Sequence, residues 1–327
     1  MSEKKKIAFY WCASCGGCDE AVVDLNETLL AIADAVEIVL WPLAMDFKYK
    51  DIERMEKESI AVSFINGAIR TEEQVRIVKM LKEKSKQVMA FGSCAHMGGI
   101  PGLANLSSRS AIFESTYHRS PTVENSAGTV PLPVSGDSSG KEMRLPVFYD
   151  QVFALDQVVD VDCYLPGCPP MPDTIQEALT AVLTGTLPEK GAVLSPNISL
   201  CDGCARRKTK KPHTKITKIV RPHEIEADPD LCFLEQGIIC MGPATRTGCG
   251  EVCILGNMPC TGCYGPLDQV TDQGAKMLTA LASLFDAKSE EEAAAMADQV
   301  PDPAGTFSRY SVPKTYLAQK RPEEHPQ

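Results

Sequence analysis

Short apolar runs alternate with amphipathic stretches along the first half of the chain. Two of these stretches, 19–33 and 71–85, repeat their apolar residues at helical spacing, and Thr71 and Gln74 are placed like a capping box at the start of the second. The apolar runs are short and continuous, as in buried strands; they are residues 7–11, 37–42, 61–67 and 87–92. This order of elements predicts an α/β domain in which helices cover a parallel sheet.

A longer segment interrupts the alternation. Residues 98–150 are rich in Gly, Pro and Ser and lack periodicity, which predicts a long excursion from the sheet. This excursion either covers the surface of a partner or is an ordinary surface insertion. The sheet pattern resumes with the apolar run 156–165 and with residues 166–185, whose second half predicts a helix that ends at Gly185.

The pattern stops after residue 190. Residues 195–267 have little repeating hydrophobicity but eight cysteines, so we expect metal coordination to supply much of their stability. A helical run, 272–299, and a Pro-rich polar tail follow. We therefore predict a first domain over 1–188, an irregular metal-binding domain with C-terminal helices over 189–300, and a tail over 301–327.

Charge and hydropathy exclude several classes of protein. The net charge of −10 argues against nucleic acid as the main partner, because phosphate binding needs a basic face. No apolar stretch reaches the roughly 18 residues that a membrane span requires. The lysines at 4–6 lead into a strand rather than into a signal-peptide core, so we expect a cytoplasmic protein.

The unusual feature of the composition is its fourteen cysteines. A reducing cytoplasm disfavours disulfides, and a chain of 327 residues does not need them to fold, so metal ligation is the expected role. Six cysteines precede residue 170 and eight lie between 201 and 263; their positions are 12, 15, 18, 94, 163, 168, 201, 204, 232, 240, 249, 253, 260 and 263.

Three predicted strands are followed by loops that contain cysteine, and parallel strands present such loops at one edge of the sheet. The loops contain CASCGGC at 12–18, GSCAHMGG at 92–99 and PGCPP at 166–170. A Cys-x-x-Cys pair with two distant cysteines commonly supplies the four thiolates of an iron-sulfur cluster. The candidate ligands are Cys15, Cys18, Cys94 and Cys168. Cys12 and Cys163 are interpreted as small buried residues, with Cys12 as an alternative to Cys15.

Zinc is the alternative metal, because it also binds paired Cys-x-x-Cys motifs. For CDGC at 201–204 and CTGC at 260–263 the residues alone leave both metals open. The N-terminal ligands are about 75 residues apart, whereas zinc sites usually close over short local loops, and this favours clusters. A zinc-stabilised interaction module and a dithiol oxidoreductase are the competing hypotheses.

Three motifs together resemble the small subunit of nickel-iron hydrogenases: SCGGCDE at 14–20, GSCAHMGGIPG at 92–102 and LPGCPP at 165–170. The resemblance covers most of the chain. It implies a flavodoxin-like domain that holds a 4Fe-4S cluster proximal to the active site of a large subunit. It also implies that this chain has no catalytic residue, since the nickel-iron site belongs to the large subunit.

The resemblance further implies how twelve cysteines divide among three 4Fe-4S clusters. The proximal ligands are Cys15, Cys18, Cys94 and Cys168; the medial ligands are Cys249, Cys253, Cys260 and Cys263; the distal ligands are Cys201, Cys204, Cys232 and Cys240. Many uptake hydrogenases have three cysteines and a 3Fe-4S cluster at the medial position, so the fourth, Cys253, implies 4Fe-4S. Cys201 stands where many members have histidine.

The all-cysteine ligand set and the absence of a twin-arginine leader and a membrane tail are most similar to the cytoplasmic, methyl-viologen-reducing, deazaflavin-non-reducing hydrogenases. The implied function is an electron relay from the large subunit to an iron-sulfur or flavin partner, such as a small ferredoxin-like subunit or heterodisulfide reductase. The bifunctional NAD(P)-linked sulfhydrogenases have a similar small subunit and are the alternative. Candidate interfaces with the large subunit are 98–150 and the tail after 301.

A basic segment follows CDGC. Residues 205–221 contain eight basic side chains: Arg206, Arg207, Lys208, Lys210, Lys211, Lys215, Lys218 and Arg221. The segment is either a docking patch that steers an acidic electron-transfer partner to the distal cluster or a solvated loop. His96, two residues after Cys94, either forms a hydrogen bond near the proximal cluster or is an ordinary packed histidine.

Overall fold

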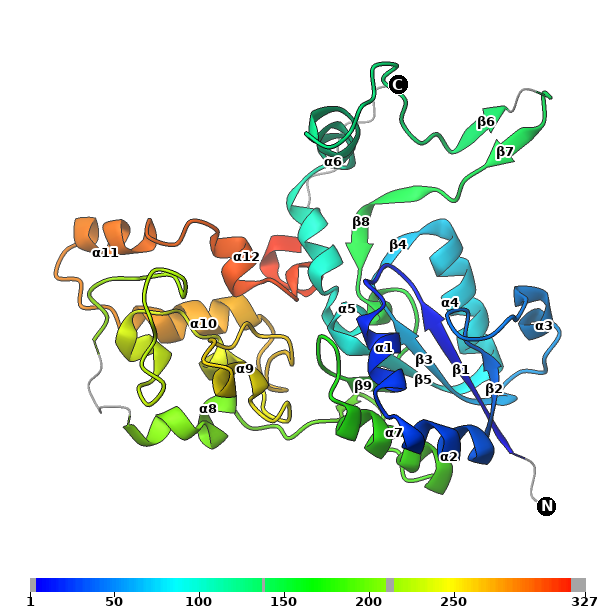
Figure 1. The fold of residues 1–327 in the computed structure, drawn as a ribbon, viewed down its shortest axis with the longest axis horizontal. Helices are drawn as coiled ribbons and strands as arrows, with labels where there is room; N and C mark the ends of the chain where they lie inside the picture. Colours follow the sequence, from blue (N-terminus) through cyan, green and yellow to red (C-terminus); the bar gives the residue numbers. More distant parts are fainter. Residues whose placement is uncertain (1–3, 137–138, 210–214, 319–327) are drawn as a thin grey trace.

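A computed structural model describes residues 4–136, 139–209 and 215–318. Its largest element is a six-stranded parallel sheet in the order β10-β9-β5-β3-β1-β2 (Figure 1). The strands are β1 (Lys5–Trp11), β2 (Val36–Leu40), β3 (Ile60–Asn66), β5 (Ser85–Phe91), β9 (Cys163–Leu165) and β10 (Ala192–Val193). The predicted α/β class and its flavodoxin-like sheet are confirmed.

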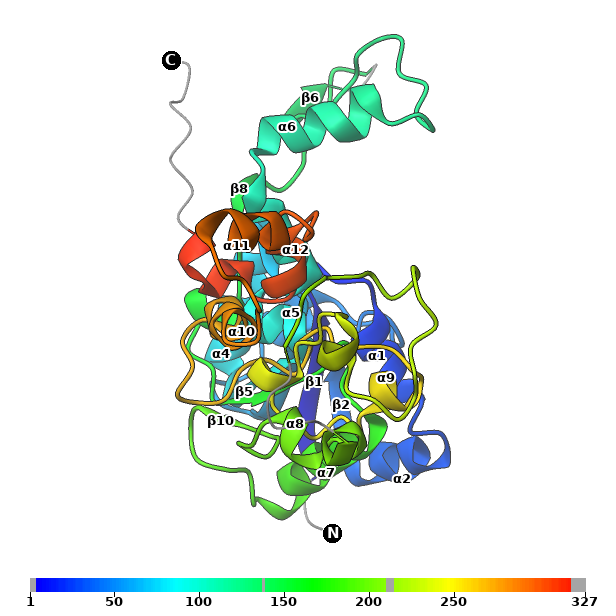
Figure 2. The same ribbon diagram turned by 90° about the vertical axis from the view of Figure 1, so that its left-hand side faces the viewer.

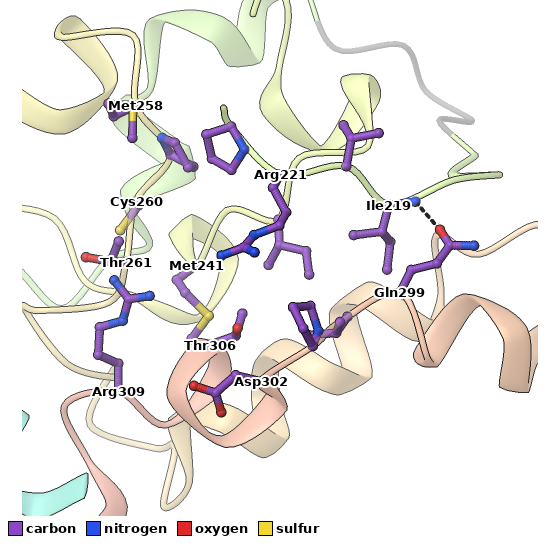
Figure 3. A pocket seen from close by; sticks show the side chains of 16 residues that line it. Ile219, Arg221, Met241, Met258, Cys260, Thr261, Gln299, Asp302, Thr306 and Arg309 are labelled. Carbon is purple, nitrogen blue, oxygen red and sulfur yellow. Dashed lines mark hydrogen bonds between the residues drawn. The ribbon is translucent and has the colours of Figure 1, made fainter. Parts of the chain in front are cut away.

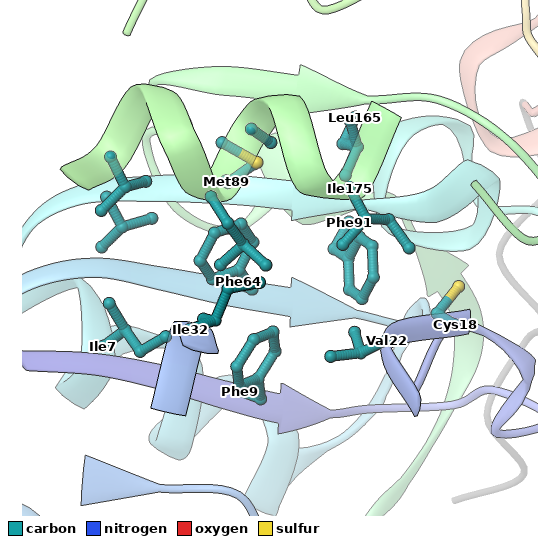
Figure 4. Packing of buried hydrophobic residues seen from close by; sticks show 14 of the residues in the cluster. Ile7, Phe9, Cys18, Val22, Ile32, Phe64, Met89, Phe91, Leu165 and Ile175 are labelled. Atoms are coloured by element: carbon teal, nitrogen blue, oxygen red, sulfur yellow. The ribbon is translucent and has the colours of Figure 1, made fainter. Parts of the chain in front are cut away.

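Successive strand residues point to opposite faces of this sheet, and apolar side chains lie on both faces. Helices therefore cover both faces. Phe9 of β1 packs into one core with Phe64 and Phe91 (Figure 4). The next residue, Tyr10, packs into the core on the other face. The helices of the first face are α1 (Gly17–Val23), α2 (Glu27–Ala35) and α7 (Pro172–Thr184). Those of the second face are α3 (Tyr49–Glu53), α4 (Glu72–Lys84) and α5 (Gly92–Met97).

Local signals in the sequence account for several element boundaries. The predicted capping box starts α4, since Gln74 N donates to Thr71 Oγ1 at 3.3 Å and Thr71 N donates to Gln74 Oε1 at 3.0 Å. The predicted helix 19–33 is wrong as one element: it is divided into α1 and α2 at Asn26, whose φ of 52° does not continue a helix. Of the predicted strand 156–165, the last three residues form β9. The start of that range belongs to the 3-10 turn η3 (Leu155–Gln157).

The excursion between β5 and β9 leaves the sheet edge and extends away from it (Figure 1, Figure 2). It begins with η1 (Ile100–Leu106) and returns through β8 (Phe148–Phe153), which pairs antiparallel with β4 (Ile69–Thr71). Its outer part contains α6 (Arg109–Phe113), the π-helical turn η2 (Glu114–Arg119), β6 (Val134–Gly136) and β7 (Glu142–Arg144). Exposed apolar side chains lie along it: Leu132, Val134, Met143 and Leu145.

The cysteine-rich region after residue 195 has short helical turns around its own core. These are α8 (Leu200–Gly203), η4 (Ala205–Thr209), η5 (Phe233–Gln236), η6 (Gly242–Ala244) and α9 (Val252–Leu255). The core includes Cys240 and Cys260 among its buried residues. The expected helical run 272–299 is two helices, α10 (Gln273–Ala282) and α11 (Glu290–Ala297), because the Ser289 side chain caps a new helix by accepting from Glu292 N.

Residues 303–318, which the sequence analysis places in the polar tail, pack against the domain that contains the six-stranded sheet. They form α12 (Pro303–Phe307), η7 (Val312–Lys314) and η8 (Tyr316–Ala318). Val312 is buried, Gln157 Nε2 donates to Pro313 O at 2.9 Å, and Gly99 N donates to Tyr310 O at 2.9 Å. Of the helices in the described ranges, none is long and apolar enough to cross a membrane.

Candidate metal centres

The four cysteines expected at the proximal position come from three loops at the carboxyl ends of β1, β5 and β9. Cys15 and Cys18 lie at the start of α1, Cys94 lies in α5, and Cys168 follows β9. Burial raises the pKa of the Cys18 thiol, and its neighbours Cys94 and Cys168 raise it further. Burial, and then Cys168 and Cys15, raise the pKa of Cys94 to about 12. The fold therefore brings these four thiols into one electrostatic neighbourhood.

Two glycines leave the room that a cluster at these thiols needs. A Cβ built on Gly92 would lie 2.5 Å from Cys18 Sγ, and one on Gly99 would lie 2.4 Å from Cys94 Sγ. Both glycines have positive φ, at 85° and 56°. At these two positions the main chain therefore lies next to a candidate ligand sulfur with no side chain between them. Glycine at such positions lets the main chain approach a cluster closely. The thiol set and this space fit an iron-sulfur cluster.

A second set gathers in the cysteine-rich region and consists of the expected distal ligands, Cys201, Cys204, Cys232 and Cys240. Burial, and then its three partners in the set, raise the pKa of Cys201 to about 12. All four line one small cavity whose other walls are mainly apolar. A Cβ on Gly242 would lie 3.1 Å from Cys201 Sγ, so backbone again approaches a sulfur closely.

A buried arginine, Arg206, lines the same cavity. Its Nη1 donates to the carbonyl oxygens of Asp228 and Leu231 at 2.8 and 2.9 Å, and its Nη2 donates to Asn257 Oδ1 at 2.5 Å. Its guanidinium carbon lies 4.0 Å from the centroid of the Phe233 ring. The side chain, only 5% exposed, ties together segments from three parts of the sequence and places a positive charge beside the four thiols.

The expected medial set, Cys249, Cys253, Cys260 and Cys263, lies between the other two. Burial, and then Cys168, Cys249 and Cys253, raise the pKa of Cys263 to about 12, so Cys263 faces both its own set and the first one. Ser93 Oγ, next to Cys94, donates to Cys263 O at 2.5 Å. At the other side, Cys260 N donates to Cys240 Sγ at 3.4 Å. Gln273 fixes the intervening loop by donating to Gly262 O at 3.0 Å.

Each predicted set of four is therefore brought together, while the role of its members as ligands stays a prediction. Within the described ranges no three His, Cys, Asp or Glu side chains converge on a point where one metal ion is held. A 4Fe-4S cluster binds one thiolate to each of four irons, so its ligands surround a volume rather than a point.

The remaining cysteines and His96 are buried side chains that belong to none of the three sets. Cys12 and Cys163 are 5% and 1% exposed and pack into the two cores of the sheet. His96 is buried with its ring 4.7 Å from that of Tyr164, and its Nδ1 has no hydrogen-bond partner among the described residues. His96 is thus a packed side chain of α5, and a role beside the proximal cluster stays a prediction.

The basic segment is not uniformly exposed. Arg206 is buried, and Arg207 forms a surface ion pair with Asp202. Lys215, Lys218 and Arg221 are exposed. Lys210, Lys211 and the side chain of Lys208 lie outside the described part of the chain.

Sequence reasoning missed two polar positions near the sets. Asp19 is 1% exposed and accepts hydrogen bonds from Trp41 Nε1 and Asn66 Nδ2, both at 2.8 Å. Burial raises the pKa of Asp19, which these hydrogen bonds counteract. Ser93 is the second, and its only signal in the sequence is its place beside Cys94.

Known proteins are similar to this chain over nearly its whole length. The family model described as NADH ubiquinone oxidoreductase, 20 Kd subunit, matches residues 15–182. The iron-sulfur subunit of the F420-non-reducing hydrogenase of Archaeoglobus profundus is 38% identical over 96% of this chain and 98% of its own. The corresponding subunit of the F420-non-reducing hydrogenase of Methanothermobacter thermautotrophicus is 37% identical over 99% of both chains.

One solved structure supports the fold alone. It is the recombinant NiFeSe hydrogenase from Desulfovibrio vulgaris Hildenborough in the oxidized state, which is 16% identical and aligns with a TM-score of 0.52. The alignment covers 81% of this chain and 95% of the other. At this identity the likeness concerns the path of the backbone.

Proposed function

Because this chain belongs to the family of hydrogenase small subunits that includes its F420-non-reducing relatives, we propose that it is the electron relay of its hydrogenase. Subunits of this family carry iron-sulfur clusters and pair with a large subunit. The relay connects the nickel-iron site of the large subunit with an iron-sulfur or flavin partner, such as a small ferredoxin-like subunit or heterodisulfide reductase. It does so through three 4Fe-4S clusters, held by the proximal, medial and distal sets.

The observation that supports this proposal best is the continuity of the three sets. Ser93 and Cys263 join the proximal set to the medial one, and Cys260 and Cys240 join the medial set to the distal one. Each join is a single hydrogen bond between neighbouring segments. A chain that only stabilised separate metal sites would need no such succession from the sheet edge to the far end of the cysteine-rich region.

The residues of this chain hold and tune the relay. When bound, a 4Fe-4S cluster at each set would supply one-electron transfer. The thiolates would hold the cluster, and the Cys260 N–H, which donates to Cys240 Sγ, would stabilise negative charge there and so raise the reduction potential at the distal position. Apolar side chains, including Leu200, Phe233 and Ile254, line the cavity of the distal set and lower the polarity around its thiols.

The alternative function is that of the small subunit of an NAD(P)-linked bifunctional hydrogenase. The F420-non-reducing relatives are similar to this chain over nearly its whole length, including the cysteine-rich region, and this supports the acceptor class proposed here.

The relay is tested in the complex with the large subunit, prepared without oxygen. Under hydrogen, we expect the absorbance near 400 nm to bleach and methyl viologen to be reduced. In Cys15→Ser, both responses should fall together, because electrons no longer enter. In Cys240→Ser, part of the bleaching near 400 nm should persist. Reduction of a protein that accepts electrons from the distal position should be lost.

The matched control is Cys163→Ser, which changes a buried cysteine outside the three sets and should retain both responses. Equal loss in Cys15→Ser and Cys240→Ser, with Cys163→Ser unaffected, would contradict an ordered relay. Wild-type activity in both ligand variants would contradict it as well.

A further inference from the structure

A pocket opens beside the medial set, between four segments of the chain. Its lining comes from residues 219–222, from Ile239 and Met241, from the loop 258–261 and from residues 299–309 (Figure 3). The pocket has a volume of about 330 Å³. Cys260 belongs to its lining, and the N–H of that same residue binds Cys240 Sγ. A molecule bound here therefore lies next to the hydrogen bond that connects the medial set with the distal set.

Two arginines point into this pocket from its opposite sides, Arg221 from above and Arg309 from below (Figure 3). Within the described part of the chain the Arg221 guanidinium has no hydrogen bond or ion pair; the hydrogen bonds of Arg221 are made by its backbone N–H and C=O, both with Glu224. Arg309 Nε donates to Gly305 O at 3.0 Å, which holds the side chain in the pocket lining. Neither side chain forms an ion pair with an acid of the described chain.

The pocket offers these cations only one carboxylate. Asp302 is the single acid among the lining residues, and its Oδ1 caps α12 by accepting from Gly305 N at 2.9 Å. The two arginines therefore outnumber it. In a chain of net charge −10, such a local surplus of positive charge is a specific feature that attracts anionic groups.

The other walls are largely apolar. They include Met258, which is 52% exposed, together with Pro259, Val300 and Pro301. Exposed thioether and proline surface beside paired guanidinium groups favours a ligand that has both carboxylates and an apolar body. Lys215 and Lys218, exposed on the segment that leads to Arg221, extend the positive charge beyond the pocket. An extended macromolecular surface matches this spread better than a small free anion does.

We propose that this pocket receives an acidic surface segment with an apolar tip, carried by the protein that accepts electrons from the relay. The inference rests on the proposed function and assigns its docking site. Carboxylates of the segment pair with Arg221 and Arg309, and its apolar side chain packs on Met258. Docking in this pocket places the acceptor beside the hydrogen bond between Cys260 and Cys240.

The test uses the complete complex with its large subunit and, as the probe, a small acidic plant-type 2Fe-2S ferredoxin. Each hydrogen molecule is oxidised to two protons and two electrons, which reduce two ferredoxins. At low salt, Arg221→Glu/Arg309→Glu should lower the second-order rate of ferredoxin reduction by about tenfold or more and flatten its salt dependence. Reduction of methyl viologen should stay within about twofold of wild type, because this small cation needs no acidic docking segment.

The matched control reverses two exposed lysines elsewhere on the chain, Lys79→Glu/Lys86→Glu, and should leave both rates unchanged. Three results overturn the inference: an unchanged ferredoxin rate in the arginine variant, an equal loss in the lysine variant, or loss of the large subunit from the arginine variant. A wild-type complex that lacks iron or does not reduce methyl viologen with hydrogen contradicts the proposed function itself, so the two failures are distinguishable.

Discussion

The backbone amide of Cys260 donates a hydrogen bond to Cys240 Sγ across 3.4 Å. This bond joins a cysteine of the medial set to one of the distal set, although the two residues lie on different loops. The same medial set reaches the proximal one through the bond from Ser93 Oγ to Cys263 O, at 2.5 Å. The order of the three sets is therefore built into the packing of the loops.

Replacing Cys253 tests the medial assignment. Cys253 is exposed, so Cys253→Ser should leave the fold intact and remove one thiolate from the medial set only. We expect a loss of about one to four iron atoms per chain, as the cluster converts to 3Fe-4S or is lost. Iron analysis with electron paramagnetic resonance measures this. Unchanged iron content and turnover would show that Cys253 is no ligand.

The backbone space beside Cys18 is tested by Gly92→Ala. The added Cβ would lie 2.5 Å from Cys18 Sγ, at a φ of 85°, so the cluster site must distort. We expect about four iron atoms per chain to be lost, which corresponds to the proximal cluster. Gly140→Ala is the matched control, because Gly140 has a φ of 80° and open space around its Cβ position. Equal iron contents in the two variants would refute the role assigned to Gly92.

Arg206→Met should destabilise the cysteine-rich region. The change removes the charged hydrogen bonds of Arg206 to Asp228 O, Leu231 O and Asn257 Oδ1, at a cost of about 2 to 4 kcal/mol. The two carbonyl oxygens keep their longer hydrogen bonds from Gln236 Nε2, both at 3.1 Å. We expect the temperature at which the absorbance near 400 nm is lost to fall by roughly 5 °C or more. Arg207→Met removes only an exposed ion pair and should change it by about 1 °C or less. A similar small effect of both variants would contradict the structural role of Arg206.

The buried Cys163 gives a pH-dependent prediction. Burial, and then Asp162, raise its pKa to about 12, above the value of about 8.5 in an unfolded chain. Its contribution to stability is therefore present below about pH 8.5 and is lost as the pH rises toward 12. At about pH 8.5 the native thiol should react with iodoacetamide about a thousandfold more slowly than the unfolded one. Mass spectrometry after alkylation measures the ratio, and equal rates would mean that Cys163 is accessible.

Local patterns in the sequence predicted the sheet well, because its strands and helices are specified by nearby residues. The capping box of Thr71 and Gln74 is an example, since both partners lie within one turn. The break between α10 and α11 was missed, because the cap at Ser289 competes with a run of good helix formers on both sides.

Contacts between distant segments could not be predicted in the same way. Arg206 belongs to a basic run and looked exposed, but its partners are 22, 25 and 51 residues away. Likewise, the division of the eight later cysteines came from resemblance, because residues 195–267 have no periodicity from which to derive their packing. Val312 is buried although the sequence placed it in a polar tail; the neighbouring Pro313 is held by Gln157, which lies 156 residues earlier.

The most direct test of the account is a count of iron and acid-labile sulfide in the chain, purified without oxygen together with its large subunit. Three 4Fe-4S clusters predict about 12 of each per small subunit, beyond the iron of the large subunit, with an absorbance near 400 nm that bleaches on reduction. Zinc in place of this iron, or about four iron atoms with the cysteine-rich region unoccupied, would contradict the relay of three clusters.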